Sequence, residues 1–572
     1  MYEVTRRFVE LVTSRMLDPR TSAVRTVHGI LPEDAPTSFR SWGAVMASQY
    51  AANLEKPWLI YHDEHGQRSV WSYAVFVDTT QRLAQLLTTH GVQRGHRVVI
   101  ASHNHPDTIL AYMACWLLGA CAVPLNMTED HQRLRYILGA CGATTALCRP
   151  EYAAHLADDL QLSGYQTIVM DTDDAARSTF YDALRHQAPY PFPTPEFDQR
   201  WDECLMVYTS GTTGHPKAVV LIQQNLFADG EAIAAWHGIT ADQRMMCVLP
   251  VHHVNGTIVT HVTPFLVGGS VVLHRKFSAR RFFPSIVAED VNVVSVVPTL
   301  LAMLLETDAS ADGIDAVQAG GLRHIICGAG PLTCELAERF EHRYHIPIIH
   351  GYGLSETTCY SCFVPVDLAH EEHRHWMQDY GFPSIGVSIP ANEMAILRSD
   401  GSPAEVGERG EIVIRGATVM TGYDRNPEAN ATAFAGDWFH SGDEGFYVLD
   451  HVGRAFYFIT GRLKELIIRG GVNLAPLEID EVINRAPGVG AGICVGFEHT
   501  LYGEEVGALV VRSSSQVTEE DVLSYCRAHL PFSKSPKVVV FTDALPVTST
   551  GKYQRNRVKH LFAEWKDARF HP

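Results

Sequence analysis

The sequence predicts an α/β fold: a large N-terminal domain of parallel α/β subdomains plus a small β-rich subdomain, followed by a compact α+β C-terminal region. Between about residues 60 and 350, short β-branched runs alternate with helical patterns. From residue 395 to 457 the pattern changes to strands separated by glycines, and after residue 464 helices and strands are mixed. At 572 residues the chain is too long for one core and should divide into at least two domains.

The N-terminal elements alternate between strand and helix. Residues 97–100 and 122–125 are the expected strands, residues 108–118 an apolar helix and residues 130–138 an amphipathic helix. This alternation predicts βαβ units, in which parallel strands carry helices on their faces. Ligands of such sheets bind beyond the carboxyl ends of the strands.

Later elements are shorter and more varied. Strands at residues 394–397, 411–414 and 455–459 predict the β-rich subdomain. In the C-terminal region we expect helices at residues 477–484 and 519–530 and strands at residues 492–495 and 508–511. Thr518 and Asp521 form a capping box at the start of the second helix, and Pro531 ends it.

Composition excludes several classes of protein. The net charge of −18 leaves no whole-chain basic footprint, so we expect no nucleic-acid partner. Apolar runs such as residues 293–305 are interrupted and too short to span a bilayer; this run predicts a buried strand and helix, and no integral membrane segment is expected. Charges within the first twelve residues argue against a secretory signal, so the cytoplasm is the expected location.

Twelve cysteines in apolar contexts predict reduced core residues rather than a disulfide framework. Cys359 and Cys362 form a CxxC pair, but no second pair lies at zinc-site spacing, so a pocket-wall or core role is expected. The run HEEHRH at residues 370–375 could ligate a metal, but its polar surroundings predict a solvated loop.

The segment YTSGTTGHPK at residues 208–217 carries the strongest functional signal. Its glycines allow the backbone to approach an anion closely, and its N–H groups, hydroxyls and Lys217 supply donors and positive charge. We expect it to hold a nucleotide triphosphate. It is not the common P-loop, because His215 and Pro216 separate Gly214 from Lys217. For this segment alone, a linker is the alternative.

The segment resembles the phosphate-binding signature of the adenylate-forming (ANL) superfamily, which includes acyl-CoA synthetases, aryl-CoA ligases, peptide-synthetase adenylation domains and luciferases. Four further segments match that family in the right order: GYGLSET at residues 351–357 (adenine and magnesium), WFHSGD at 438–443 (ribose), GRLKELIIRGG at 461–471 (hinge and thiol tunnel) and PVTSTGK at 546–552 (catalytic lysine). Weaker similarity extends upstream to about residue 37, although His96 stands where the family usually has Asp.

The resemblance implies a division into an N-terminal extension (residues 1–36), an adenylate-forming domain (37–460), a hinge (461–464) that pivots at Lys464, and a mobile α+β lid domain (465–572). It also implies a two-step reaction. ATP, with Mg²⁺, activates a carboxylic acid to an acyl-adenylate, and the thiol of coenzyme A then takes the acyl group.

The resemblance further implies roles for single residues. Lys552 would reach from the lid to bridge the carboxylate and the α-phosphate, and Glu356 would hold the magnesium ion. Tyr352 would face adenine, and Asp443, with Arg462 beside it, would accept from the ribose hydroxyls. Further nucleotide-binding residues are Thr209, Ser210, Gly211, Thr212, Thr213, Gly214, Lys217, Gly328, Ala329, Gly330, Gly351, Gly353, Ser355 and Thr357.

The acyl pocket is assigned just after residues 249–250, where the family carries an aromatic or His gate. This gate is His253, with a buried core histidine as the alternative. The predicted lining is His253, Val254, Asn255, Val296, Gly328 and Gly353. It contains no Lys or Arg, which favours a monocarboxylate with an apolar or bulky body. Gly470 and Gly471 would line the CoA tunnel, unless Gly471 is needed only for a turn with positive φ.

The sequence therefore predicts an ATP-dependent acyl-CoA synthetase with ATP and coenzyme A as substrates. A carrier-protein phosphopantetheine is the alternative acceptor, and a non-catalytic nucleotide-binding scaffold is the alternative from another class. The identity of the acid (fatty, aryl or polycyclic), a homodimeric assembly and the role of residues 1–36 stay open at this stage.

Overall fold

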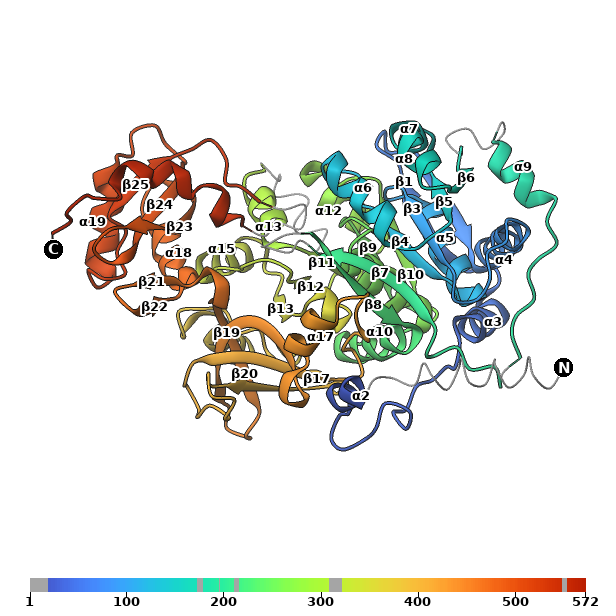
Figure 1. Ribbon diagram of the computed structural model, residues 1–572, viewed down its shortest axis with the longest axis horizontal. Coiled ribbons are helices and arrows are strands. Elements are labelled where there is room, and N and C mark those ends of the chain that lie inside the picture. Colours follow the sequence, from blue (N-terminus) through green and yellow to red (C-terminus); the bar gives the residue numbers. More distant parts are fainter. Residues whose placement is uncertain are drawn as a thin grey trace.

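The computed structural model describes residues 19–171, 178–194, 196–209, 215–307, 321–547 and 553–571. Figure 1 shows an elongated molecule in which C-terminal elements such as α19 (Glu519–His529) lie at one end of the long axis and N-terminal helices such as α4 (Tyr73–Thr89) lie toward the other. The predicted α/β fold class, with a large N-terminal domain and a smaller C-terminal domain, is confirmed.

A seven-stranded sheet forms one half of the N-terminal domain, in the order β18-β8-β7-β4-β3-β5-β6. Strands β7, β4, β3, β5 and β6 are parallel, whereas β8 and β18 run antiparallel to their neighbours. The bounds are β3 Arg97–Ala101, β4 Cys121–Pro124, β5 Thr145–Cys148, β6 Gln166–Val169, β7 Glu203–Thr209, β8 Lys217–Ile222 and β18 Gly422–Tyr423. β3 and β4, with helices α5 (Pro106–Leu118) and α6 (His131–Ala140), confirm the predicted alternation.

A nine-stranded sheet forms the other half, in the order β15-β14-β13-β12-β11-β9-β10-β1-β2. The six strands from β13 to β1 are parallel, and antiparallel strands close both edges. The bounds are β1 Pro57–His62, β2 Arg68–Ser72, β9 Arg244–Cys247, β10 Ser270–His274, β11 Val293–Val296, β12 His324–Cys327, β13 Ile348–Tyr352, β14 Cys362–Phe363 and β15 Val387–Ser388. β11 and helix α13 (Pro298–Leu305) confirm the buried strand and helix expected at residues 293–305.

Helices pack on and between the two sheets. α5 is buried along its whole length, as expected for a helix that is apolar on all sides. Trp116 of α5 meets Trp42 edge to face, with 4.9 Å between ring centroids. The other N-terminal helices are α2 Pro19–Arg25, α3 Trp42–Asn53, α7 Pro150–His155, α8 Ala157–Leu162, α9 Thr179–Arg185, α10 Gln223–His237, η1 Asn255–Val262, α11 Thr263–Leu266, α12 Ala279–Ala288, α15 Cys334–Tyr344, η2 Ser355–Thr357, α16 His370–Gln378, α17 Pro427–Ala433 and η3 Ala435–Asp437.

The predicted β-rich subdomain is a four-stranded antiparallel sheet in the order β16-β17-β19-β20. Its bounds are β16 Asn392–Leu397, β17 Gly410–Gly416, β19 Phe439–Leu449 and β20 Ala455–Arg462. Figure 1 shows this sheet between the N-terminal sheets and the C-terminal domain. Its last strand, β20, ends at Arg462, within the predicted hinge.

The C-terminal domain has its own apolar core, built on strands β21–β25 and helices α18 and α19. The capping box is confirmed: Thr518 Oγ1 accepts from Asp521 N at 3.2 Å, and Asp521 Oδ2 accepts from Thr518 N at 2.9 Å. The bounds are η4 Leu463–Glu465, β21 Ile467–Arg469, β22 Val472–Leu474, α18 Pro476–Arg485, β23 Val489–His499, β24 Gly503–Arg512, β25 Val538–Phe541, η5 Arg555–Arg557 and η6 Lys559–Trp565.

The solvated loop expected at residues 370–375 is wrong, because these residues begin α16. His373, Trp376 and Met377 recur at helical spacing, and all three are buried. Trp376 stacks on Phe456 of β20 with 3.8 Å between ring centroids. The histidine run therefore belongs to an amphipathic helix whose buried face begins within the run, at His373.

The N-terminal extension packs on the large domain through α2. Arg25 is fully buried, and its Nη2 donates to Gln224 Oε1 of α10 at 2.6 Å. Burial lowers the pKa of Arg25 to about 9.

The helices and the cysteines bear on the expectations drawn from composition. Within the described ranges, no helix combines the length and apolarity needed to cross a membrane. All twelve cysteines fall in these ranges; each is free and buried, and Cys359 and Cys362 lie in the core as expected.

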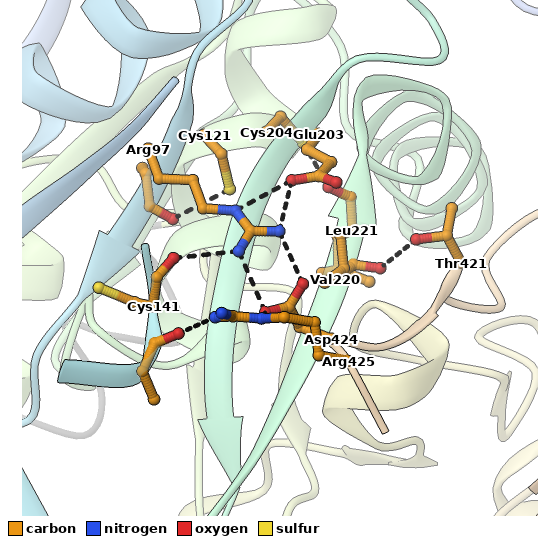
Figure 2. A network of polar contacts seen from close by, with 12 residues as sticks. Arg97, Cys121, Cys141, Glu203, Cys204, Val220, Leu221, Thr421, Asp424 and Arg425 are labelled. Atoms are coloured by element: carbon orange, nitrogen blue, oxygen red, sulfur yellow. Dashed lines mark hydrogen bonds and ion pairs between the residues drawn. The ribbon is translucent and has the colours of Figure 1, made fainter. Parts of the chain in front are cut away.

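A polar network centred on Arg97 ties β18 to the seven-stranded sheet (Figure 2). The Nη2 of Arg97 lies 2.9 Å from a carboxylate oxygen of Glu203 and 2.9 Å from one of Asp424, and Nη1 donates to Cys141 O at 3.0 Å. The Arg97 side chain is 15% exposed, so its charge depends on these partners more than on water. Asp424 directly follows β18, and the network therefore fixes the position of Tyr423.

We predict that Arg97→Met lowers stability by about 2 kcal/mol, because two neighbouring carboxylates lose their shared cation. Urea unfolding followed by tryptophan fluorescence measures the change. Arg94→Met is the matched control: Arg94 pairs with Asp202 at 2.7 Å, but its side chain is 36% exposed. The control should cost less than about 1 kcal/mol. Equal losses in both variants would contradict an anchoring role for Arg97.

Candidate active site

The predicted phosphate loop connects the two strands of an antiparallel hairpin. Thr209, the last residue of β7, is paired with Lys217, the first residue of β8. Residues 210–214 of the prediction (Ser210, Gly211, Thr212, Thr213 and Gly214) lie outside the described residues. The Nζ of Lys217 lies 4.6 Å from the centroid of the Tyr423 ring, in a cation–π contact. The hairpin thus places the lysine beside β18.

Tyr423 also contacts the residue predicted to bind magnesium. Glu356 lies in the short 3-10 helix η2, directly after β13, and Tyr423 Oη donates to Glu356 Oε1 at 3.0 Å. Burial raises the pKa of Tyr423. One tyrosine therefore joins Lys217 and Glu356, and the Arg97 network holds that tyrosine in place. Ser355 and Thr357 flank Glu356 in the same turn.

The predicted adenine and ribose residues form a buried cluster. Asp443 of β19 is 1% exposed and accepts from Tyr352 Oη at 2.5 Å. The Nε of Arg462, its partner across β19 and β20, lies 2.9 Å from Asp443 Oδ1. Asp443 raises the pKa of Arg462, and burial raises the pKa of Tyr352. The cluster thus joins the end of β13 to the last residue of β20.

This cluster opens into a cavity shared by both domains. Ala329 in its wall has a φ of 63°, an uncommon backbone conformation for a residue with a side chain. Strained conformations of this kind concentrate at functional sites. The lining includes Ala329, Gly330, Gly351, Tyr352, Gly353, Asp443 and Arg462 from the N-terminal side, and Glu465, Pro476, Leu477, Asp480, Glu481, Asn484, Tyr553 and Arg555 from the C-terminal side.

Lys552 lies outside the described residues, but its neighbour Tyr553 lines the cavity. Close to Tyr553, Arg555 is 6% exposed; its Nη1 donates to Asp480 Oδ1 at 3.0 Å, and its Nε lies 3.8 Å from Glu465. Tyr553 and Arg555, which follow the predicted catalytic lysine in the sequence, thus line the same cavity as Tyr352 and Asp443. The catalytic role of Lys552 itself stays a prediction.

Glu481 makes a contact between the domains. Its carboxylate accepts from the backbone N–H groups of Cys334, at 3.0 Å, and Glu335, at 3.3 Å. These groups belong to the N-terminus of α15, where free N–H donors and the helix dipole favour an acceptor with negative charge. Burial raises the pKa of Glu481, which is 6% exposed. The contact fastens α18 of the C-terminal domain to the N-terminal domain.

Gly470 and Gly471 form the turn between β21 and β22. Their φ angles are 58° and 83°, so a hairpin turn with two residues at positive φ requires both glycines. A Cβ added to Gly471 would meet nothing within 4 Å. The structure therefore shows the turn requirement, and the predicted tunnel role of both glycines stays a prediction. Lys464, the predicted pivot, lies in η4.

The residues predicted for the acyl pocket come from four elements. His253 and Val254 precede η1, a π-helix of the kind often found at functional sites, and Asn255 begins it. Val296 ends β11, Gly328 follows β12, and Gly353 follows β13. The rings of His252 and His253 lie 4.4 Å apart, and burial lowers the pKa of His252.

Sequence reasoning missed several residues of the site. Tyr423 and Glu481 were missed because their partners, Glu356 and Cys334, are distant in the sequence and come close only in the folded protein. Arg133 of α6, whose Nη2 donates to Thr209 O at 3.3 Å beside the phosphate loop, was also missed. Tyr360, whose Oη accepts from Nδ2 of the predicted pocket residue Asn255 at 3.1 Å, was missed although it lies only four residues after Glu356. An aromatic residue so close to the motif was an available signal.

The fold and the clustered residues define a two-domain protein with a candidate nucleotide site between its domains. The family model of the AMP-binding enzymes matches residues 47–424, and the model of their C-terminal domain matches residues 478–552. The chain therefore belongs to the AMP-binding enzyme family. It is an acid–CoA ligase that activates a carboxylic acid with ATP as an acyl-adenylate and transfers the acyl group to coenzyme A.

Several relatives support this membership. The chain is 32% identical to a sulfoacetate–CoA ligase from Cupriavidus necator over 91% of its own length and 97% of the relative's. It is 31% identical to an oxalate–CoA ligase from Arabidopsis thaliana over 86% and 94%. Among solved structures, ATP-bound MatB from Rhodopseudomonas palustris has a TM-score of 0.80 at 26% identity, covering 92% of this chain and 100% of that one. O-succinylbenzoate coenzyme A synthetase from Bacillus subtilis, solved with ATP and a magnesium ion, has a TM-score of 0.75 at 27% identity, with 90% and 99% covered.

We predict that Glu481→Gln loosens the contact between the domains, because the amide presents an N–H₂ group to helix N–H donors. Hydrogen bonds to charged groups contribute roughly 1.5–3 kcal/mol, so limited proteolysis within residues 461–466 should become about tenfold faster. Glu498→Gln is the control, since Glu498 is 74% exposed and pairs with Lys566 inside the C-terminal domain. Unchanged proteolysis of the Glu481 variant would show that other contacts hold the domains together.

Proposed function

We propose that Lys217, Glu356, Tyr352, Asp443, Arg462 and Lys552 carry out the ATP-dependent half of the ligase reaction. A carboxylate oxygen of the acid attacks the α-phosphorus, the bond to the pyrophosphate leaving group breaks, and pyrophosphate is released. The thiol of coenzyme A then displaces AMP from the acyl carbon. The single observation that best supports this proposal is the Tyr352–Asp443–Arg462 cluster in a cavity shared with the segment next to Lys552.

The barrier of the first step is largely electrostatic, because an anionic nucleophile approaches an anionic phosphate. Lys217, at the end of the phosphate hairpin, would neutralise charge on the β- and γ-phosphates. Lys552 would neutralise the negative charge that the attacking carboxylate and the α-phosphate bring together. Asp443 would accept from the ribose hydroxyls, and Tyr352 would pack against adenine. Thr209, Gly328, Ala329, Gly330, Gly351, Gly353, Ser355 and Thr357 would complete the nucleotide site.

Glu356 would hold Mg²⁺, which would screen the phosphate charge. Tyr423 donates to its Oε1, and among the described residues its Oε2 has no hydrogen-bond partner. A single carboxylate with this free oxygen fits an ion that prefers one or two protein oxygens together with substrate phosphates. The magnesium ion in the related Bacillus subtilis synthetase supports the same proposal.

Coenzyme A is the acceptor named for the relatives, so the carrier protein is the less supported alternative. The scaffold alternative is disfavoured, because these relatives are ligases.

We also propose a cytoplasmic location, which the twelve free, buried thiols support. A homodimer stays a proposal. The relatives' names span sulfoacetate, oxalate and ferulate, and they do not select one acid.

If Lys552 serves adenylate formation and Gly471 serves thioester formation, substitution of each residue should slow a different half-reaction. Lys552→Ala should lower acid-dependent ATP–pyrophosphate exchange by roughly 10² to 10³, because one donor to the transition state is removed. Gly471→Leu should leave exchange largely intact and slow thioester release, if the thiol enters past this turn. Both half-reactions are measured for each variant, the second with supplied acyl-adenylate.

Gly401→Leu is the control for backbone strain, since Gly401 also has a positive φ of 81° and no atom within 4 Å of an added Cβ. If Gly471→Leu and Gly401→Leu behave alike, the tunnel assignment is wrong. If Lys552→Ala keeps near wild-type exchange, the lysine is misassigned. Comparing coenzyme A with a phosphopantetheinylated carrier protein as acceptor separates the two acceptor alternatives.

A further inference from the structure

Tyr360 packs against Gly328, which is predicted to line the acyl pocket, and against Gly351. Its side chain is 1% exposed. A Cβ added to Gly328 would lie 2.6 Å from Tyr360 Oη, and one added to Gly351 would lie 2.9 Å from its Cδ1. The backbone at the ends of β12 and β13 thus packs directly against the tyrosine ring. No side chain fits between this backbone and the ring.

A buried polar network fixes the hydroxyl end of the ring. Asn255 Nδ2 donates to Tyr360 Oη at 3.1 Å, and Ser295 Oγ donates to Asn255 Oδ1 at 2.7 Å. Ser295 is fully buried and Asn255 is 6% exposed. Moving the hydroxyl out of this network would leave a buried polar group unsatisfied, which costs roughly 1–3 kcal/mol. The network therefore resists displacement of the ring by a substrate.

The backbone that carries Tyr360 is held just as firmly. Thr358 has a φ of 66° and a ψ of −64°, and Cys359 N donates to Thr357 O at 2.8 Å, which defines a strained γ-turn. Thr358 Oγ1 donates to Thr418 O at 2.6 Å. The carboxyl of Asp229, fully buried in α10, accepts from Tyr360 N at 3.4 Å, and burial raises the pKa of Asp229.

The face of the ring is blocked as well. The centroids of the Tyr360 and Phe363 rings lie 4.4 Å apart, and Phe363 is fully buried. Rotation of Tyr360 away from Gly328 and Gly351 would therefore require repacking of a close-packed core. Hydroxyl, backbone and ring face are each fixed by a different part of the chain.

We propose that Tyr360 closes the acyl pocket and restricts the substrate to short carboxylic acids without a ring or a long alkyl tail. This inference rests on the proposed function, because it assumes that the acid lies beside Asn255, Gly328 and Gly353. It departs from the bulky body expected from the sequence. That expectation counted the absence of charged residues in the lining but left out the volume of Tyr360.

Pyrophosphate release by the full-length enzyme, with ATP, Mg²⁺ and coenzyme A, tests the proposal on two sets of acids. Acetate, propionate and sulfoacetate form the short set; benzoate, phenylacetate and octanoate form the bulky set. For the wild type, kcat/KM for the best short acid should exceed that for every bulky acid by at least about 100-fold. Tyr360→Ala should raise kcat/KM for a bulky acid by at least about tenfold and lower it for the short acid.

Tyr360→Phe keeps the ring and removes only the hydroxyl, so the preference for short acids should persist. Tyr344→Ala is the matched control, since Tyr344 is also fully buried but lies on α15, where its hydroxyl donates to Leu304 O at 2.7 Å. It should lower stability without changing acid preference.

A wild-type preference for a bulky acid would overturn the proposal even if Tyr360→Ala fails to fold. So would unchanged acid preference in a folded Tyr360→Ala variant. If the wild type releases pyrophosphate with a bulky acid only, the pocket inference fails and the proposed function stands. If no acid of either set, nor any in a wider screen, supports pyrophosphate release, the proposed function itself fails.

Discussion

One buried carboxylate, Asp443, joins the parts of the molecule that meet at the candidate site. It lies on β19 of the β-rich sheet, accepts a hydrogen bond from Tyr352 at the end of β13, and faces Arg462 at the end of β20. At 1% exposure its charge is balanced by these partners and not by water. The carboxylate of Asp443 therefore joins the nine-stranded sheet, the β-rich sheet and the predicted hinge residue Arg462 at one point.

Among the described residues, buried ion pairs lie mainly within each domain, whereas few polar contacts join one domain to the other. Arg97 has its ion-pair partners within the N-terminal domain and Arg555 within the C-terminal domain, and both side chains are largely buried. Between the domains, Glu481 reaches the N-terminus of α15, and Arg409 pairs with Glu478 at 3.3 Å with partial exposure. Leu477 of α18 adds an apolar contact with the cluster that contains Trp376 and Phe458. The contacts between the domains are thus fewer than those within each domain, and the predicted movement of the C-terminal domain stays a prediction.

Local patterns predicted most of the fold and the outline of the site. Alternating β-branched and helical runs gave the strands and helices around residues 97–138. The glycine-rich residues 210–214 lie outside the described residues, so their phosphate-binding role stays a prediction. Tyr423 and Glu481 could not be predicted, because their partners lie 67 and 147 residues away. The helix at His370–Gln378 was missed because its first turns are polar and its buried face begins only at His373. Tyr360 was visible in the sequence, but its blocking effect depends on the close approach of Gly328 and Gly351.

Hydrogen–deuterium exchange of Asp443→Ala, compared with the wild type, tests most directly whether this carboxylate holds the site together. Without it, the buried Tyr352 hydroxyl has lost its acceptor and Arg462 its counter-charge. Exchange should become faster at residues 351–357 and at residues 461–466, while β3, β4 and the strands of the C-terminal core keep wild-type protection. Unchanged exchange at residues 461–466 would contradict the account, because the start of the C-terminal domain would then be positioned without Asp443.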